Sequence, residues 1–201
     1  MPLPEKIVLA SGNKGKLREI RELLAGLDIN VVPQSDFQVS DADETGLTFV
    51  ENAILKARHA ASVTGLPAIS DDSGIEVDVL GGAPGIYSAR YAGVGASDAD
   101  NLQLLLDNVA ATGVDKPAAR FQCVMVFLRS EHDATPVIAQ GTWEGYLVNQ
   151  AKGQNGFGYD PIFHVPEQGC TSAELPPEIK NKLSHRGQAL RQLLQKLSAL
   201  K

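Results

Sequence analysis

Cysteine is scarce in this sequence, and its histidines are scattered. The 201 residues include only two cysteines, Cys123 and Cys170, which is too few for a disulfide framework. The four histidines have neither the paired spacing nor the neighbouring cysteine of a zinc site. We therefore expect neither a small disulfide-stapled secreted domain nor a zinc protein.

Long apolar runs and an excess of positive charge are also missing. No segment approaches the roughly 18 apolar residues of a membrane-spanning helix, and the apolar part of "MPLPEKIVLA" is too short for a secretory signal. Lysine and arginine number 18 against 24 acidic residues, a formal net charge of −6. Surfaces that bind nucleic acid or anionic membranes are usually basic, so we expect neither partner, and a cytoplasmic location.

Apolar residues are present in the amount that a globular domain needs. They make up 43% of the 201 residues, and a chain of this length buries roughly 70% of its unfolded surface. The sequence shows no internal repeat and no low-complexity linker. We therefore expect a single domain over residues 1–201, with two lobes.

The stretch "VLASGNKGKLREI" near the N-terminus has the pattern of a strand, a turn and the start of a helix. It offers Gly12, Gly15 and Lys16 of a Walker loop, but Leu17 stands where that motif needs serine or threonine. Free N–H groups at a helix start, together with Lys14 and Lys16, attract anions. A phosphate-binding turn and a merely solvated turn both fit this pattern.

The N-terminal third predicts two helices around an acidic segment. The first helix is expected from Lys14 to Ala25, followed by a short strand at "INVVP" and the irregular acidic segment "SDFQVSDADETG". Thr48 and Glu51 then form a capping box, and Gly65 marks the end of the second helix. On this second helix three polar residues share one face: Asn52, Lys56 and His59.

The remainder of the chain mixes strands and helices. "PAISDDSGIEVDVL" predicts a strand, an acidic turn and a second strand, and "GGAPGIYSARYAG" predicts a glycine-rich loop leading into an extended piece. A capped helix is expected near Ser97, and "ARFQCVMVFLRS" and "PVIAQGTWEGYLV" predict an antiparallel hairpin. The C-terminal tail is expected to be helical, with a break near Ser184. The pattern favours an α/β fold around a mixed sheet.

Two acidic segments offer candidate metal ligands. Asp71 and Asp72 are adjacent, and adjacent side chains on a strand point to opposite faces, so only one of them can easily face a given site. Magnesium prefers one or two carboxylates, with waters and phosphates completing its shell. Glu44 in "DADETG" is the second candidate acid. A simple acidic turn remains the alternative for "SDDSG".

Two later segments offer candidate contacts for a nucleotide base. In "NGFGYDP" the aromatic rings of Phe157 and Tyr159 stand between glycines and can either stack on a planar base or anchor a tight turn. "KNKLSHRG" gathers lysines, His185 and Arg186 near the expected helix break. This basic group is either a solvated face or part of a binding site.

Taken together, the segments "SGNKGK", "ETGLTFVENAILKA", "SDDSG", "GGAPGIYSARYAG", "GFGYDP" and "LSHRGQAL" resemble, in order, the inosine/xanthosine triphosphate pyrophosphatase family. The resemblance spans nearly the whole chain. It implies an α/β fold, an elongated mixed sheet with flanking helices and two lobes around a central active-site cleft. It also implies magnesium-dependent hydrolysis of ITP, dITP and XTP to the monophosphate and pyrophosphate, by a homodimer.

The same resemblance implies roles for individual residues. Asp72 would be the general base and, with Glu44, a ligand of Mg²⁺. The remaining matched residues would bind the nucleotide, the first seven of them at the triphosphate: Ser11, Gly12, Asn13, Lys14, Gly15, Lys16, Lys56, Ser73, Phe157, Gly158, Tyr159, Asp160, Lys180, His185 and Arg186. Tyr159 stands where the family often has tryptophan, and a phenol ring still stacks on a base.

Selection for deaminated purines has a chemical basis. A 6-oxo purine presents an acceptor where adenine presents a donor, so arginine and lysine, which only donate, can select it. Two other functions remain open, a sister pyrophosphatase for modified pyrimidine nucleotides and a nucleotide sensor without turnover. The choice among ITP, dITP and XTP also remains open.

Overall fold

The computed structural model describes residues 5–24 and 30–199. Within these residues the α-helices are α1 (Lys14–Leu24), α2 (Phe49–Thr64), α3 (Asp98–Ala111), α4 (Pro177–Leu183) and α5 (His185–Ser198). The strands are β1 (Lys6–Ala10), β2 (Asn30–Pro33), β3 (Ala68–Val77), β4 (Ala118–Leu128), β5 (Val137–Leu147), β6 (Phe163–Val165) and β7 (Cys170–Thr171). Five short 3-10 helices join them: η1 (Gln34–Phe37), η2 (Asp78–Leu80), η3 (Gly85–Arg90), η4 (Asp160–Ile162) and η5 (Ser172–Glu174).

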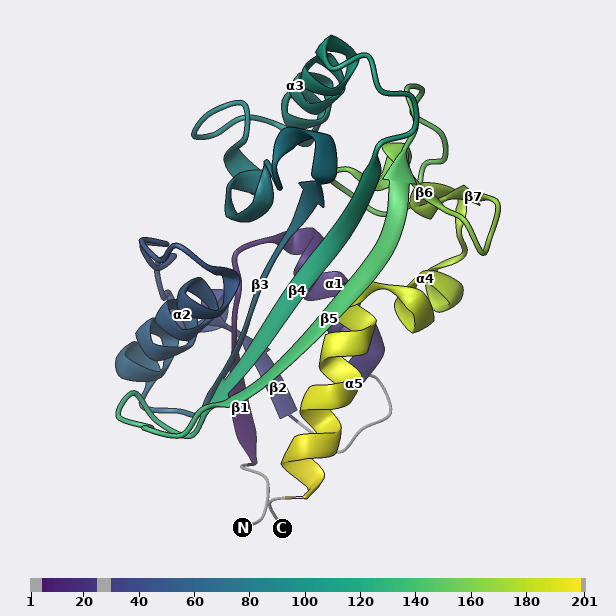
Figure 1. Cartoon of the computed structure of the whole chain (residues 1–201). Helices are drawn as coiled ribbons and strands as arrows, with labels where there is room; N and C mark the ends of the chain where they lie inside the picture. Colours follow the sequence, from purple (N-terminus) through teal and green to yellow (C-terminus); the bar gives the residue numbers. More distant parts are fainter. Residues whose placement is uncertain (1–4, 25–29, 200–201) are drawn as a thin grey trace. The chain divides into compact units, whose positions relative to one another are not determined.

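The strands form one mixed sheet in the order β2-β1-β3-β4-β5-β6-β7 (Figure 1). Strand β1 pairs in parallel with β2 and β3, so that Val8 lies opposite Val32 and Ala68. Strand β6 pairs antiparallel with β5 and β7. The neighbours β4 and β5 are joined by residues 129–136 alone, a connection that suits only antiparallel strands. The expected α/β fold with a mixed sheet is confirmed, as is the hairpin.

The chain folds into two compact units. Unit 1 comprises Met1–Asp72, Cys123–Gly141 and Arg186–Lys201, and unit 2 comprises Ser73–Gln122 and Thr142–His185. Strands β3, β4 and β5 contribute residues to both units.

Unit 1 has a helix layer on each face of its part of the sheet. Alternate side chains of a strand point to opposite faces. On β1, Ile7 and Leu9 pack in one buried cluster with residues of α1 and α5, whereas Val8 and Ala10 pack in another with residues of α2. Figure 1 shows α2 on one side of these strands and α1 and α5 on the other.

Helix α2 forms as the sequence predicts. The Thr48 hydroxyl accepts the Glu51 N–H at 3.3 Å and donates to the Glu51 carboxylate at 2.8 Å. At the other end Gly65 takes the left-handed conformation, with φ 67°, that ends a helix. The face toward the sheet is a stripe of fully or almost fully buried alanines, which brings the helix close to the strands: Ala53, Ala57, Ala60 and Ala61.

Unit 2 is built on a separate, aromatic core. Helix α3 is capped by Ser97, whose side chain accepts the Asp100 N–H, as the sequence predicts. Buried rings pack beneath it, with the Phe163 centroid 4.6 Å from that of Phe121 and 5.3 Å from that of Trp143.

Three expected boundaries agree with the structure within the described residues. Helix α1 begins at Lys14 and strand β2 ends at Pro33, as expected, while the predicted boundaries at Ala25 and Ile29 lie outside those residues. The predicted break in the C-terminal tail is confirmed, because α4 ends before Ser184 and α5 begins after it.

The predicted acidic turn in "PAISDDSGIEVDVL" is wrong. Residues 68–77 form the uninterrupted strand β3, and Asp71 and Asp72 are buried within it. A turn is the usual way to expose two adjacent carboxylates, but here each of them meets a cationic side chain inside the fold.

The extended piece expected after "GGAPG" is also wrong, because Gly85–Arg90 form the 3-10 helix η3. In this segment Gly74 and η3 lie close together, and a Cβ on Gly74 would stand 2.2 Å from the Gly85 carbonyl oxygen. The short strands β6 and β7 carry too few residues for a period-2 pattern, so the sequence did not predict them.

Among the helices of the described residues, none combines the length and the hydropathy that a membrane span requires.

We predict that Ala60→Leu lowers the free energy of unfolding by about 1–3 kcal/mol, because the added methylene groups meet the sheet at a fully buried position. Ser62→Leu, at an exposed position of the same helix, is the matched control and is expected to change stability by less than about 0.5 kcal/mol. Urea unfolding of the two variants tests the prediction, and equal losses would show that α2 does not pack tightly through its alanines.

Candidate active site

Asp71 and Asp72 of β3 serve opposite faces of the sheet within unit 1. Asp71 contacts side chains of α1 and α5, and Asp72 contacts a side chain of α2. Both carboxylates are almost fully buried, with 1% and 4% exposure. The alternation expected for adjacent residues on a strand is therefore confirmed.

The Asp71 carboxylate is held by two cations. Lys16 Nζ lies 3.3 Å from Asp71 Oδ2, and Arg186 Nη2 lies 3.3 Å from the same oxygen. Arg186, which is 2% exposed, also forms a salt bridge with Glu19, a buried acid of α1. The four side chains thus form a buried network with two positive and two negative charges.

This network fixes the ionisation of Asp71. Burial raises the pKa of a carboxyl group, but Lys16, Arg186 and Lys56 outweigh burial and hold the pKa of Asp71 well below its usual range. Asp71 is therefore a permanent anion at neutral pH. Its Oδ1 is buried and accepts no hydrogen bond from the described residues.

On the α2 face, Lys56 joins two acids. Its Nζ lies 2.9 Å from Glu44 Oε1 and 2.7 Å from Asp72 Oδ1, so both carboxylates lie around one ammonium group. Burial lowers the pKa of Lys56, but Asp72, Asp71 and Glu44 together outweigh it and the pKa is raised. Lys56 therefore remains protonated.

Asp72 differs from its neighbour Asp71. Burial raises the pKa of Asp72 and exceeds the opposing effects of Lys56 and Lys16. Its Oδ2 is buried and has no hydrogen-bond partner among residues 5–24 and 30–199. A carboxylate with a raised pKa and an oxygen available inside the fold is suited to accept a proton or to bind a hard cation.

The turn before α1 has the features expected of an anion-binding turn. Asn13 Oδ1 accepts the Lys16 N–H at 3.0 Å, and Ser11 Oγ accepts the Asn13 N–H at 3.3 Å. Gly12 lies against Asp41, because a Cβ on Gly12 would stand 2.7 Å from Asp41 Oδ1. Most of the turn remains exposed: Gly12, Asn13 and Lys14.

Two of the predicted site residues of unit 2, Phe157 and Lys180, contact a third, Asp160. Its carboxylate accepts the Ser172 hydroxyl at 2.6 Å, the Lys180 ammonium at 2.6 Å and the Phe157 N–H at 2.8 Å. Lys180 Nζ also lies 5.3 Å from the centroid of the Phe157 ring. Asp160 is 3% exposed, so in this structure it organises the loop from within.

The other predicted residues of unit 2 have different surroundings. Tyr159 is buried in the aromatic core and its hydroxyl donates to the Ser88 carbonyl at 2.7 Å, which is the anchoring role weighed above against base stacking. His185 is stacked on Phe121, with centroids 4.7 Å apart. Ser73 lies half-buried on β3, and Gly158 donates its N–H to Asp98 at 2.8 Å. Their roles toward a substrate remain predictions.

Glu19 is the residue of this arrangement that the sequence analysis missed. Lys16 precedes Glu19 by three residues on α1, so the two side chains share a face of the helix. This spacing is the signal in the sequence that could have identified Glu19. Asp71 was considered in the sequence but passed over in favour of Asp72. The structure shows that both are buried and ion-paired.

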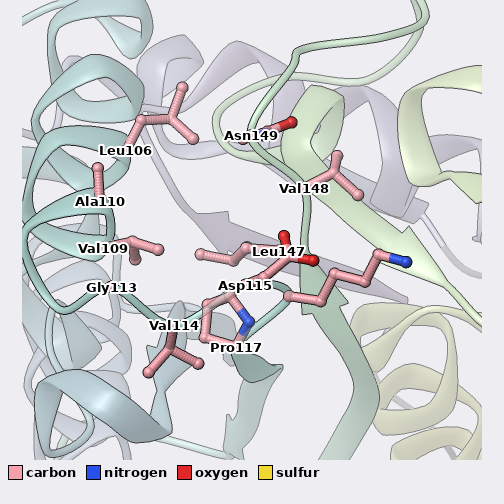
Figure 2. A pocket seen from close by; sticks show the side chains of 11 residues that line it. Leu106, Val109, Ala110, Gly113, Val114, Asp115, Pro117, Leu147, Val148 and Asn149 are labelled. Atoms are coloured by element: carbon pink, nitrogen blue, oxygen red, sulfur yellow. The ribbon is translucent and has the colours of Figure 1, made fainter.

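A hollow of about 240 Å³ in unit 2 lies elsewhere in the chain, between the end of α3 and the end of β5 (Figure 2). Its lining includes Leu106, Val109, Pro117 and Leu147 and contains none of the predicted site residues.

Comparison with known proteins assigns this arrangement to a family. The model of the Ham1 family matches residues 7–196. A dITP/XTP pyrophosphatase of Vibrio parahaemolyticus is 58% identical over 195 residues, which is 97% of this chain and 98% of that protein. A dITP/XTP pyrophosphatase of Photorhabdus laumondii is 57% identical over 193 residues, 96% of this chain and 98% of that protein.

Two solved structures also match this chain over nearly its whole length. A HAM1 protein from Coxiella burnetii matches with a TM-score of 0.90 and 51% identity, over 98% of this chain and 100% of that one. A nucleoside-triphosphatase, dITP/XTP pyrophosphatase, from Mycobacterium abscessus matches with a TM-score of 0.73 and 39% identity, over 94% and 98% of the two chains.

We predict that Arg186→Met lowers the free energy of unfolding at pH 7 by about 3–5 kcal/mol, because Glu19 and Asp71 then remain buried with less compensating charge. Buried carboxylates without a cation favour their protonated forms, so the loss should shrink from pH 8 to pH 5. The wild-type pKa of Asp71 is depressed, so its stabilising contribution is lost only below about pH 4 and does not change in this window.

Urea unfolding at pH 5 and pH 8 measures this effect. Arg191→Met, at an exposed position of α5, is the matched control for the loss of an arginine. A loss of equal size at both pH values would contradict the assignment of the effect to the buried carboxylates.

Proposed function

The chain belongs to the Ham1 family, and from this membership we propose that it hydrolyses the deaminated purine nucleoside triphosphates dITP, XTP and ITP to the monophosphate and pyrophosphate. The names of relatives 57% and 58% identical over nearly their whole length support the substrate class. Within this chain, the observation that carries the proposal is the group of Glu44, Lys56 and Asp72, in which two carboxylates lie beside one ammonium group and Asp72 is buried.

The residues of this group fit a magnesium ion. Magnesium uses one or two protein carboxylates and completes its shell with waters and substrate phosphates. Glu44 and Asp72 converge on one ammonium group, and Asp72 Oδ2 is a buried oxygen without a partner among the described residues. The described residues contain no group of three histidine, cysteine or acidic side chains that could hold a metal without the substrate. We propose that Glu44 and Asp72 hold Mg²⁺, which when bound would neutralise phosphate charge.

Asp72 is the proposed general base. Burial raises its pKa, which strengthens it as a proton acceptor relative to an exposed aspartate. Its carboxylate would orient the attacking water and take its proton. Lys56, held protonated beside it, would offset the negative charge that the triphosphate brings to the two acids.

The turn from Ser11 to Lys16 is the proposed cradle for the triphosphate. Its exposed N–H groups and Lys14 favour an anion at the start of α1. A cradle that binds the outer phosphates, combined with a base that addresses the innermost one, directs water to the α-phosphorus. Pyrophosphate would then leave as one unit, with Lys16 and Lys56 stabilising its charge.

We propose that the base and sugar are bound by the residues after position 156 to which the family resemblance gives a substrate role. Lys180 and Arg186 only donate hydrogen bonds and so suit a 6-oxo group. In the structure Lys180 is paired with Asp160, and Arg186 with Asp71 and Glu19. Base recognition would therefore share these donors with the carboxylates. The residues proposed for this role are Phe157, Gly158, Tyr159, Asp160, Lys180, His185 and Arg186.

The homodimer and the cytoplasmic location belong to the same proposal. The homodimer rests on the resemblance of the sequence motifs described above, and the cytoplasmic location rests on the sequence pattern alone.

Product analysis in oxygen-18 water tests the function. We predict that the protein with Mg²⁺ converts dITP to dIMP and pyrophosphate, with label in the monophosphate and none in the pyrophosphate. A panel of dITP, XTP, dATP and a modified pyrimidine triphosphate distinguishes the purine enzyme from a sister pyrophosphatase. Release of dIDP and orthophosphate would overturn the mechanism, and nucleotide binding without turnover would indicate a sensor.

We predict that Asp72→Asn lowers kcat by about 10²–10⁴-fold while the affinity for the triphosphate stays within about tenfold, because the cationic cradle is left in place. Asp36→Asn, at an exposed position of η1, is the matched control. Steady-state kinetics with dITP measures both effects. A larger loss for Asp71→Asn than for Asp72→Asn would mean that the other face of β3 carries the chemistry.

A further inference from the structure

The loop that carries Glu44 runs along the helix that follows it. We define the acidic loop as residues 40–48. Its contacts with α2 occur in reverse order along the helix. The Ser40 carbonyl oxygen lies 3.0 Å from His59 Nε2, and Glu44 Oε1 lies 2.9 Å from Lys56 Nζ. The Gly46 N–H donates to Asn52 Oδ1 at 2.8 Å. The acidic loop therefore lies antiparallel to α2 and is bound to its polar face.

Asn52 is the most deeply buried of these contacts. It is 0% exposed, and its Oδ1 accepts the Gly46 N–H. Its Nδ2 is buried and has no hydrogen-bond partner among the described residues. Burying an amide with one half unsatisfied costs free energy. In return the asparagine supplies the acceptor for the Gly46 N–H, which a leucine of similar size would lack. A requirement beyond packing therefore favours asparagine here.

The turn at Gly46 leaves no room for a side chain. A Cβ on Gly46 would stand 2.6 Å from Glu51 Cβ and 2.7 Å from Asn52 Oδ1. The backbone of the acidic loop is thus pressed against the first turn of α2, where the Asn52 side chain receives its N–H. Glu44 precedes this fixed point by two residues.

We propose that Asn52 is a positioning residue for the reaction: by holding the turn at Gly46 it sets the Glu44 carboxylate beside Lys56 and Asp72. This inference rests on the proposed function, in which Glu44 is an acid of the active site. Asn52 itself is buried and acts through Glu44. Lys56 bonds only to the end of the Glu44 side chain, whereas the bond to Asn52 holds the backbone of the acidic loop itself.

Two properties separate this role from simple support of α2. First, the Gly46 amide must be held by Asn52, which hydrogen exchange measures without reference to activity. Second, the effect of Asn52 on turnover must pass through Glu44, which a double-mutant cycle measures.

The exchange experiment compares Asn52→Leu with Asn52→Asp. Aspartate keeps an oxygen acceptor for the Gly46 N–H and leucine does not. We expect slow exchange of the Gly46 amide in the wild type and in Asn52→Asp, and exchange at least about tenfold faster in Asn52→Leu. Fast exchange in the wild type, or equal exchange in the two variants, would overturn the proposal.

The kinetic experiment places Asn52→Leu in the wild-type and Glu44→Gln backgrounds. We expect a loss of at least about tenfold in kcat/KM for dITP in the wild-type background and less than about twofold in Glu44→Gln, because the carboxylate that Asn52 positions is then already absent. Equal losses in the two backgrounds would overturn the proposal. Ser62→Ala, exposed near the end of α2, is the control and is expected to retain wild-type turnover.

Gly46→Ala provides a second variant in case Asn52→Leu fails to fold. It disturbs the same turn from the side of the acidic loop and should show the same dependence on Glu44. A wild-type protein that does not hydrolyse dITP would overturn the proposed function alone. The exchange comparison would still decide whether Asn52 holds the turn.

Discussion

The burial of two adjacent carboxylates in the middle of β3 is the constraint on which unit 1 depends. Removing an ionised carboxylate from water costs several kcal/mol unless a cation and hydrogen bonds compensate it. Because neighbours on a strand face opposite ways, one cation cannot serve both acids at close range. Unit 1 supplies Lys16 and Arg186 on one face and Lys56 on the other. The helices on both faces therefore carry charge to the sheet as well as apolar surface.

This division gives two neighbouring residues of the same type different chemical properties. The pKa of Asp71 is depressed by its cations, whereas burial raises the pKa of Asp72. Asp71 thus suits a permanent structural charge and Asp72 suits proton transfer. The difference arises from the number of cations on each face of the strand.

The sequence predicts those parts of the fold that local patterns determine. Caps at Thr48 and Ser97 placed two helices correctly, and the interleaving of helices and strands, together with a hairpin of two long strands, predicted the mixed sheet. The sequence could not predict that β3 is continuous, because Arg186, which compensates the charge of Asp71, lies 115 residues away in the chain. A motif likewise identified Tyr159 and Asp160 as candidate site residues. It could not show that their side chains bond to Ser88 and Ser172, because these partners lie outside the motif.

The alanine stripe of α2 has a consequence for how such a protein can vary. Lys56 lies on the same helix as this stripe, and its ammonium group lies 2.7 Å from the Asp72 carboxylate of β3. The alanines let the helix lie close to the sheet, and a residue larger than alanine at these buried positions would need the helix to move outward. Natural variants that impair this ion pair are therefore expected in the apolar layer as well as among the charged residues.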